Sequence, residues 1–202
     1  MPPSAFRPVS TRRVVVCAAV MLVVHGVIAG PFVMLGQSGF ASPHDAGITG
    51  ASILLLTTLV ALSTIDWLTF RLPDALTLPL AVAGLIVHWE GGQFAVLERL
   101  IAAAVGFGLL AGAAWGYEKL RGRAGLGLGD AKLYAAAGAW LGLAGLPSVM
   151  VYATIAALAA IAGSTVMGSR VSLTSRLPFG PFLAFAIWIV WLYGPIGDAM
   201  GF

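Results

Sequence analysis

The chain has 202 residues, of which 59% are hydrophobic and 9% are charged, with a formal net charge of +3 and a mean hydropathy of +0.97. Soluble domains carry about 25% charged residues, so this composition excludes an ordinary soluble enzyme and indicates a membrane protein with no room for a sizeable soluble domain. The single cysteine, Cys17, excludes an intramolecular disulfide and any multi-cysteine metal site.

The chain begins with a basic segment, residues 1–13, followed by an apolar run at residues 14–35. This arrangement is typical of a membrane anchor or of a cleaved signal peptide. The apolar run is longer than the about 7–15 residues of a signal h-region, so we interpret it as an anchor, with cleavage as the alternative. Residues 1–46 are then an anchor span with a short outside loop, within a single membrane domain that covers residues 1–202.

Six further apolar segments follow, at residues 47–65, 75–89, 100–116, 131–145, 148–167 and 182–193. A spanning helix needs about 20 residues, so several of these segments are short. Pro147 is expected to separate the fifth segment from the sixth. In segment four, Gly108, Gly112 and Gly116 have the four-residue spacing of closely packed membrane helices. The sequence therefore predicts an all-α, polytopic transmembrane helix bundle of about seven spans.

The basic residues indicate an orientation. With a cytoplasmic N-terminus and alternating spans, every Lys and Arg except Arg99 falls on the cytoplasmic side, as the positive-inside rule expects. Topology explains the basic residues better than nucleic-acid binding does, and membrane lipid is the expected partner. The predicted location is the cytoplasmic (inner) membrane, with multiple passes.

Two aspartates lie at segment ends on this same side. Asp66 directly follows segment two, and Asp130 directly precedes segment five at the end of a glycine-alternating stretch, residues 125–129. A charged group beside a membrane segment is costly and therefore suggests a functional site. Segment five is about 22 Å long as a helix, and the hydrocarbon core is about 30 Å thick. Asp130 is therefore expected below the membrane surface, unless the bilayer thins locally.

Two neighbouring carboxylates that share a proton could hydrolyse a peptide bond, one as general base and the other as general acid. This chemistry needs no metal and no other cofactor. Two alternatives stay open at this point. One is a proton- or ion-coupled transporter that uses Asp66 and Asp130 as a relay, and the other is a non-catalytic assembly factor for a pilus or secretion machine.

Around these aspartates the sequence resembles the type IV prepilin peptidases, which belong to the GxGD class of intramembrane aspartic proteases. The first matching motif is Ile65-Asp66 followed by residues 71–79 (RLPDALTLP), and the second is residues 125–133 (GLGLGDAKL). Residues 178–183 (PFGPFL) also resemble a late loop of that family. The resemblance implies that Asp66 and Asp130 are the catalytic pair, and that the substrate is the basic leader and hydrophobic helix of a prepilin or pseudopilin.

Neighbouring residues are also expected to have roles. Gly127, Gly129 and Lys132 are expected to form the motif and contact substrate, with an interfacial lysine as the alternative for Lys132. Asp74 follows Pro73 at the start of segment three and is expected to be a helix N-cap. Many relatives also methylate the new N-terminus and carry a cytoplasmic domain, often with paired cysteines, between the first two spans. Here that interval is about ten residues and has no cysteine, so a peptidase without N-methyltransferase activity is expected.

Overall fold

A computed structural model describes residues 43–122, 127–166 and 178–196, and every regular element in these ranges is helical. The elements are α2 (Pro43–Thr69), α3 (Asp74–Val87), the short 3-10 helix η1 (Trp89–Gly91), α4 (Gly92–Arg121), α5 (Leu128–Val166) and α6 (Gly180–Tyr193). The all-α prediction is confirmed for this part of the chain. The predicted first segment, residues 14–35, lies outside the described residues, so the count of seven spans stays a prediction.

Three of these helices are long and apolar enough to cross a membrane, over Gly50–Thr69, Trp89–Arg121 and Leu128–Gly163. The helices α3 and α6 are apolar but shorter. Predicted segments two, three, four and seven correspond to α2, α3, α4 and α6, and predicted segments five and six lie together in α5. The chain is therefore an integral membrane protein in which α5 accounts for two of the predicted segments.

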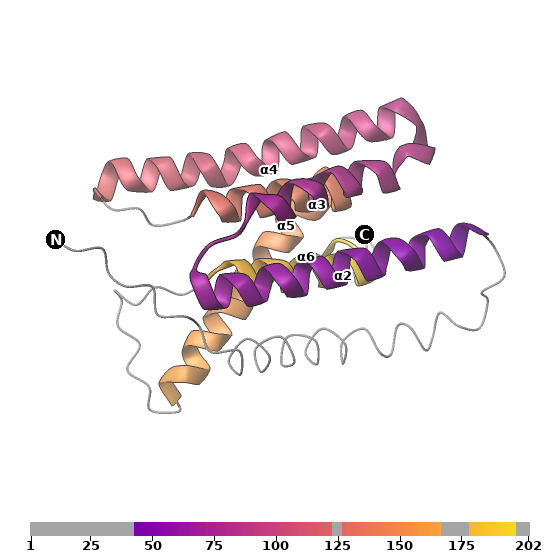
Figure 1. Cartoon of the computed structure of the whole chain (residues 1–202). Coiled ribbons are helices and arrows are strands. Elements are labelled where there is room, and N and C mark those ends of the chain that lie inside the picture. The colour runs from indigo at the N-terminus through magenta and orange to yellow at the C-terminus, as the bar shows by residue number, and fades with distance from the viewer. Residues whose placement is uncertain (1–42, 123–126, 167–177, 197–202) are drawn as a thin grey trace.

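Helix α5 is the centre of the bundle. It packs against α3, α4 and α6, while α2 packs mainly against α6 (Figure 1). In its first half the side chains of Leu133, Tyr134 and Trp140 are almost completely buried. The Trp140 indole N–H donates to the carbonyl oxygen of Leu80 at 2.7 Å, and the Tyr134 hydroxyl donates to that of Leu146, also at 2.7 Å. These bonds satisfy polar groups that would be costly to bury unpaired.

The contact between α4 and α5 depends on small residues. A Cβ atom built at Gly138 would lie 2.5 Å from the backbone of Ala102, and one at Gly106 would lie 2.8 Å from the carbonyl oxygen of Tyr134. Glycine at both positions therefore allows the two backbones to approach closely. The buried face of α4 consists of residues at four-residue spacing: Ala102, Gly106, Leu110 and Ala114.

The sequence indicated Gly108, Gly112 and Gly116, and not Gly106, as the closely packed glycines of this helix. Among the described residues, nothing lies within 4 Å of a Cβ built at Gly108, Gly112 or Gly116, so that prediction was wrong for the contacts seen here. The three glycines have the right spacing but begin two positions after Gly106. Two positions are about 200° of rotation on a helix, which turns them away from α5.

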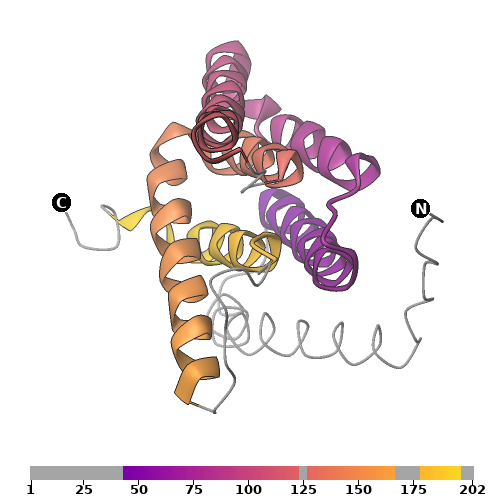
Figure 2. The ribbon, with the colours of Figure 1, turned by 90° about the vertical axis from the view of Figure 1, so that its left-hand side faces the viewer.

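Helix α5 is broken at Gly142 rather than at Pro147, and the helix continues through the proline. Gly142 has φ 72° and ψ −176°, a combination that is essentially restricted to glycine. The second half of α5 then leaves the first at a steep angle and runs along one side of the bundle (Figure 2). The predicted boundary was therefore wrong by a few residues, because the left-handed conformation of one glycine, and not the proline, ends the first half.

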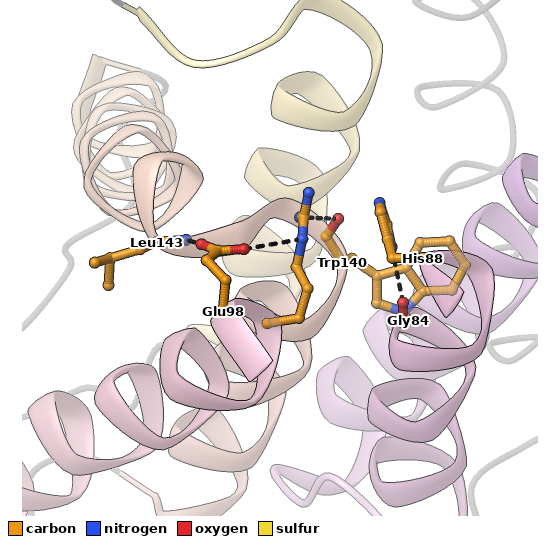
Figure 3. Close-up of polar contacts among 6 residues, drawn as sticks. Gly84, His88, Glu98, Trp140 and Leu143 are labelled. Atoms are coloured by element: carbon orange, nitrogen blue, oxygen red, sulfur yellow. Dashed lines mark hydrogen bonds and ion pairs between the residues drawn. The ribbon is translucent and has the colours of Figure 1, made fainter. Parts of the chain in front are cut away.

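Two neighbouring side chains from α4 hold this break. Arg99 Nη1 donates to the carbonyl oxygen of Trp140 at 2.8 Å, and Glu98 Oε1 accepts from the backbone N–H of Leu143, also at 2.8 Å (Figure 3). The same two side chains form an ion pair of 3.2 Å with each other. A broken helix leaves carbonyls at one end and N–H groups at the other without partners. Glu98 and Arg99 satisfy one group on each side of the break.

The break predicts a specific sensitivity at Gly142. Replacing it with alanine (Gly142→Ala) forces an L residue into the left-handed region and places a Cβ 2.9 Å from Glu98 Oε1. We expect a loss of roughly 1–3 kcal/mol of stability, measured as a lower Tm of the purified protein in detergent. Gly163→Ala, in the same helix with nothing within 4 Å among the described residues, is the matched control. Equal Tm values for the two variants would contradict this account of the turn.

Candidate active site

Asp66 lies inside α2, nearly one helical turn before its end at Thr69. The sequence suggested that the apolar segment stops at Ile65, but the helix continues because the carbonyl oxygen of Asp66 accepts the backbone N–H of Phe70 at 2.8 Å. The chain then leaves the helix through Phe70, which has a positive φ of 53°. Only 5% of Asp66 is exposed, so its carboxylate is held within the bundle.

The N-terminus of α6 lies against the carboxylate of Asp66. The backbone N–H of Gly180 donates to Asp66 Oδ2 at 3.1 Å. A Cβ built at Gly180 would lie 2.6 Å from that oxygen and 3.0 Å from the carboxylate carbon. Glycine is therefore the residue that lets the helix terminus come this close. The free N–H groups and the dipole of a helix N-terminus both stabilise an anion at such a position.

Asp130 lies in the first turn of α5 and is 8% exposed. Its backbone N–H donates to the carbonyl oxygen of Gly127 at 3.1 Å, and a Cβ at Gly127 would lie 3.7 Å from Asp130 Oδ2. Asp130 is close enough to Asp66 for the two carboxylates to interact electrostatically. The fold therefore brings together two buried aspartates from distant parts of the sequence, at the end of the bundle where α2 ends and α5 and α6 begin (Figure 1).

Gly129 has a different neighbour from Gly127. A Cβ at Gly129 would lie 2.9 Å from the Cβ of Leu72, in the linker between α2 and α3. Leu72 is half-buried and packs against the hydrophobic core. The two motif glycines thus have separate roles: Gly127 lies beside the Asp130 carboxylate, and Gly129 makes room for the α2–α3 linker.

Lys132 forms an ion pair with Asp74. Its Nζ lies 2.6 Å from Asp74 Oδ1 and 2.7 Å from Asp74 Oδ2. The prediction that Asp74 caps α3 was wrong, because Pro73 is the N-cap residue and Asp74 is the first residue of the helix. The sequence pattern could place Asp74 near a helix start, but it could not show that a lysine 58 positions away holds its carboxylate.

Gly180 is the residue that sequence reasoning left without a role. The only signal for it was the motif at residues 178–183, since a glycine offers no chemically distinctive side chain. Among the described residues, no group of three or more His, Cys, Asp or Glu side chains could hold a metal ion.

Comparison with known proteins identifies relatives. A sequence model of the type IV leader peptidase family matches residues 53–162. A protein named prepilin leader peptidase/N-methyltransferase from Aeromonas salmonicida (strain A449) is 42% identical over 147 residues, which cover 72% of this chain and 50% of that protein. The protein of the same name from Burkholderia pseudomallei (strain K96243) is 42% identical over 156 residues, covering 77% and 48%.

A third relative with the same name, from Escherichia coli (strain K12), is 36% identical over 143 residues, covering 71% of this chain and 63% of that protein. This chain therefore spans about half the length of the Aeromonas and Burkholderia relatives. No solved structure matches it.

The different neighbours of the two motif glycines predict different tolerances. Gly129→Ala places a Cβ 2.9 Å from the Cβ of Leu72 and forces the linker to move, whereas Gly127→Ala makes only ordinary van der Waals contact. We expect Gly129→Ala to lower stability by roughly 1–3 kcal/mol, as overpacking commonly does, and Gly127→Ala to change it little. Thermal unfolding in detergent measures both. If Gly129→Ala were the more stable variant, the close contact with Leu72 would be refuted.

Proposed function

The chain belongs to the type IV leader peptidase family, and on that premise we propose that it is a membrane-embedded aspartic endopeptidase acting on prepilins or pseudopilins. The bond cleaved joins the basic leader to the hydrophobic helix of the substrate, at the cytoplasmic face of the membrane. The observation that carries this proposal is the pairing of Asp66 and Asp130, two buried carboxylates that interact at one end of the bundle.

In the proposed mechanism the two aspartates have complementary roles. Close carboxylates favour holding one proton between them. The ionised carboxylate removes a proton from a water molecule, which attacks the carbonyl carbon of the scissile peptide bond. The protonated carboxyl group donates to the carbonyl oxygen, and a proton then passes to the leaving amine. The products are the leader with a free carboxylate and the shortened protein with a free amine.

The surroundings of Asp66 support this role. The Gly180 N–H holds one carboxylate oxygen and fixes the orientation of the group. Preorganised donors of this kind save the reorganisation that a carboxylate in water would need during the reaction. The position of both carboxylates at one end of the bundle also weighs against a transmembrane ion relay, which would need a path open to both sides.

The distribution of basic residues supports cleavage on the cytoplasmic side. Arg71 follows α2 at the Asp66 end, Lys119 and Arg121 lie in the last turn of α4, and Lys132 lies in the first turns of α5. Arg99 lies near the other end of α4, where Glu98 and a backbone carbonyl hold it. An excess of basic residues marks the cytoplasmic side, so the aspartate pair is expected there, in the inner membrane.

We further propose that this protein cleaves without methylating its product. The names of the relatives include an N-methyltransferase activity. Within this sequence, however, the interval between the first two predicted spans is about ten residues, and Cys17 is the single cysteine. Mass spectrometry of a prepilin processed by the purified protein with a methyl donor should show a shortened product with an unmodified amine.

The catalytic proposal is tested by removing each carboxylate. Asp66→Asn and Asp130→Asn should each lower cleavage of a purified prepilin by roughly 10²- to 10⁴-fold, because neither aspartate can act as acid and base in the same step. Cleavage is followed by gel shift and by mass spectrometry of the new N-terminus. Glu118→Gln, which removes a carboxylate from α4, is the control and should cleave at the wild-type rate. Near-normal cleavage by either Asn variant would rule out the pair.

The contact at Gly180 gives a second, steric test. Gly180→Ala keeps both carboxylates but places a methyl group 2.6 Å from Asp66 Oδ2, so the carboxylate must move. A displacement of about 1 Å can cost about 10²-fold in rate, and we expect at least a tenfold loss of cleavage with the protein still folded. Gly108→Ala, where nothing lies within 4 Å among the described residues, is the matched control. A fully active Gly180→Ala would show that the position of Asp66 is unimportant.

A further inference from the structure

The ion pair between Asp74 and Lys132 joins the two motifs that supply the aspartate pair. Asp74 is the first residue of α3 and follows Asp66 across the linker at residues 70–73. Lys132 follows Asp130 by two residues in α5. Each oxygen of Asp74 lies within 2.7 Å of the lysine nitrogen, so the carboxylate is bound through both oxygens.

Lys132 points away from the aspartate pair. Two positions along a helix correspond to a rotation of about 200°, so the side chains of Asp130 and Lys132 leave α5 on nearly opposite sides. Asp130 lies within range of an electrostatic interaction with Asp66, whereas Lys132 reaches the N-terminus of α3. This direction does not suit a lysine that would bind the substrate carbonyl or tune the charge of the pair.

A second contact joins the same linker to α5. Gly129 leaves space for Leu72, which lies in the middle of the linker. A Cβ built at Gly129 would lie 2.9 Å from the Cβ of Leu72. The linker is therefore held on α5 at two points, by packing at Leu72 and by charge at Asp74. Because α2 ends directly before this linker, fixing the linker on α5 also fixes where Asp66 lies relative to Asp130.

We propose that Asp74 and Lys132 are positioning residues, which lock the α2–α3 linker onto α5 and so set the separation of Asp66 and Asp130. The effect on cleavage rests on the proposed function, whereas the effect on the linker does not. Side chains of Lys132 and Asp74 are 31% and 56% exposed, and exposed pairs contribute modestly, so the expected effects are modest as well.

The first experiment measures cleavage kinetics of a purified prepilin. Lys132→Gln and Asp74→Asn should each lower kcat about fivefold with KM unchanged, and the double neutral variant should be no worse than either single one. The exchange variant Asp74→Lys/Lys132→Asp should recover most of the lost kcat, because it restores a pair of opposite charges. A raised KM for Lys132→Gln without recovery in the exchange variant would overturn the proposal and make Lys132 a substrate contact.

The second experiment measures the linker without any activity. In a Cys17→Ala background, Leu72→Cys introduces a single half-buried thiol, whose reaction rate with a maleimide reports how firmly the linker is held. Adding Lys132→Gln should raise this rate several-fold, and the charge exchange should bring it back down. A reaction rate that is the same with and without Lys132→Gln and the charge exchange would overturn the proposal. A changed rate in a protein that cleaves no prepilin would support the lock and refute the proposed function.

Discussion

The close approach of helix backbones that glycine permits is the constraint on which the rest of this structure depends. Between membrane helices there is little hydrophobic driving force, so association relies on tight packing and on hydrogen bonds. Gly106 and Gly138 bring α4 against α5, Gly129 admits the α2–α3 linker, and Gly180 brings the N-terminus of α6 to Asp66. Each contact is one that an alanine would obstruct. Together they place two buried carboxylates, from α2 and α5, at one end of the bundle, with Asp66 beside the start of α6.

At the break in α5, side chains of α4 rather than close backbone packing stabilise the fold. The first half of α5 is only about 21 Å long, and it ends at the break in the helix at Gly142. A break in a membrane helix exposes backbone groups that lipid cannot satisfy. Glu98 and Arg99 supply the missing partners on both sides of the break (Figure 3). This contact also explains why Arg99 is the exception to the predicted charge asymmetry, because its guanidinium group donates to a backbone carbonyl of α5.

Hydropathy predicted where helices occur, and the placement of Asp66 and Asp130 at segment ends on one side of the membrane predicted that they would be neighbours, whereas their catalytic role stays a prediction. Both rest on local properties of the sequence, namely apolar composition and residue identity. The features that the sequence placed wrongly depend on the rotation of a helix about its axis and on the position of a break along it. Spacing alone could not decide between Gly106 and the glycines from Gly108 onward as the packed face, nor between Gly142 and Pro147 as the break.

The partners of polar groups were the least predictable part. Asp74 looked like a cap because capping is local, but its carboxylate binds Lys132 from a distant helix. Gly180 contributes through a backbone N–H and through the absence of a Cβ, so no chemically distinctive side chain reveals its role. Such contacts follow from the mutual arrangement of α2, α3, α5 and α6, which a pattern along one chain does not contain.

Packing brings residues 66 and 130 together, and cross-linking in membranes tests their proximity most directly. In a Cys17→Ala background, Asp66→Cys with Asp130→Cys is treated in membranes with a short reagent that joins two thiols. The control pairs Asp66→Cys with Leu143→Cys, which lies beyond the break in α5. The account predicts rapid intramolecular cross-linking of the first pair and little of the second, detected by gel mobility and mass spectrometry. Equally slow cross-linking of both pairs would contradict it.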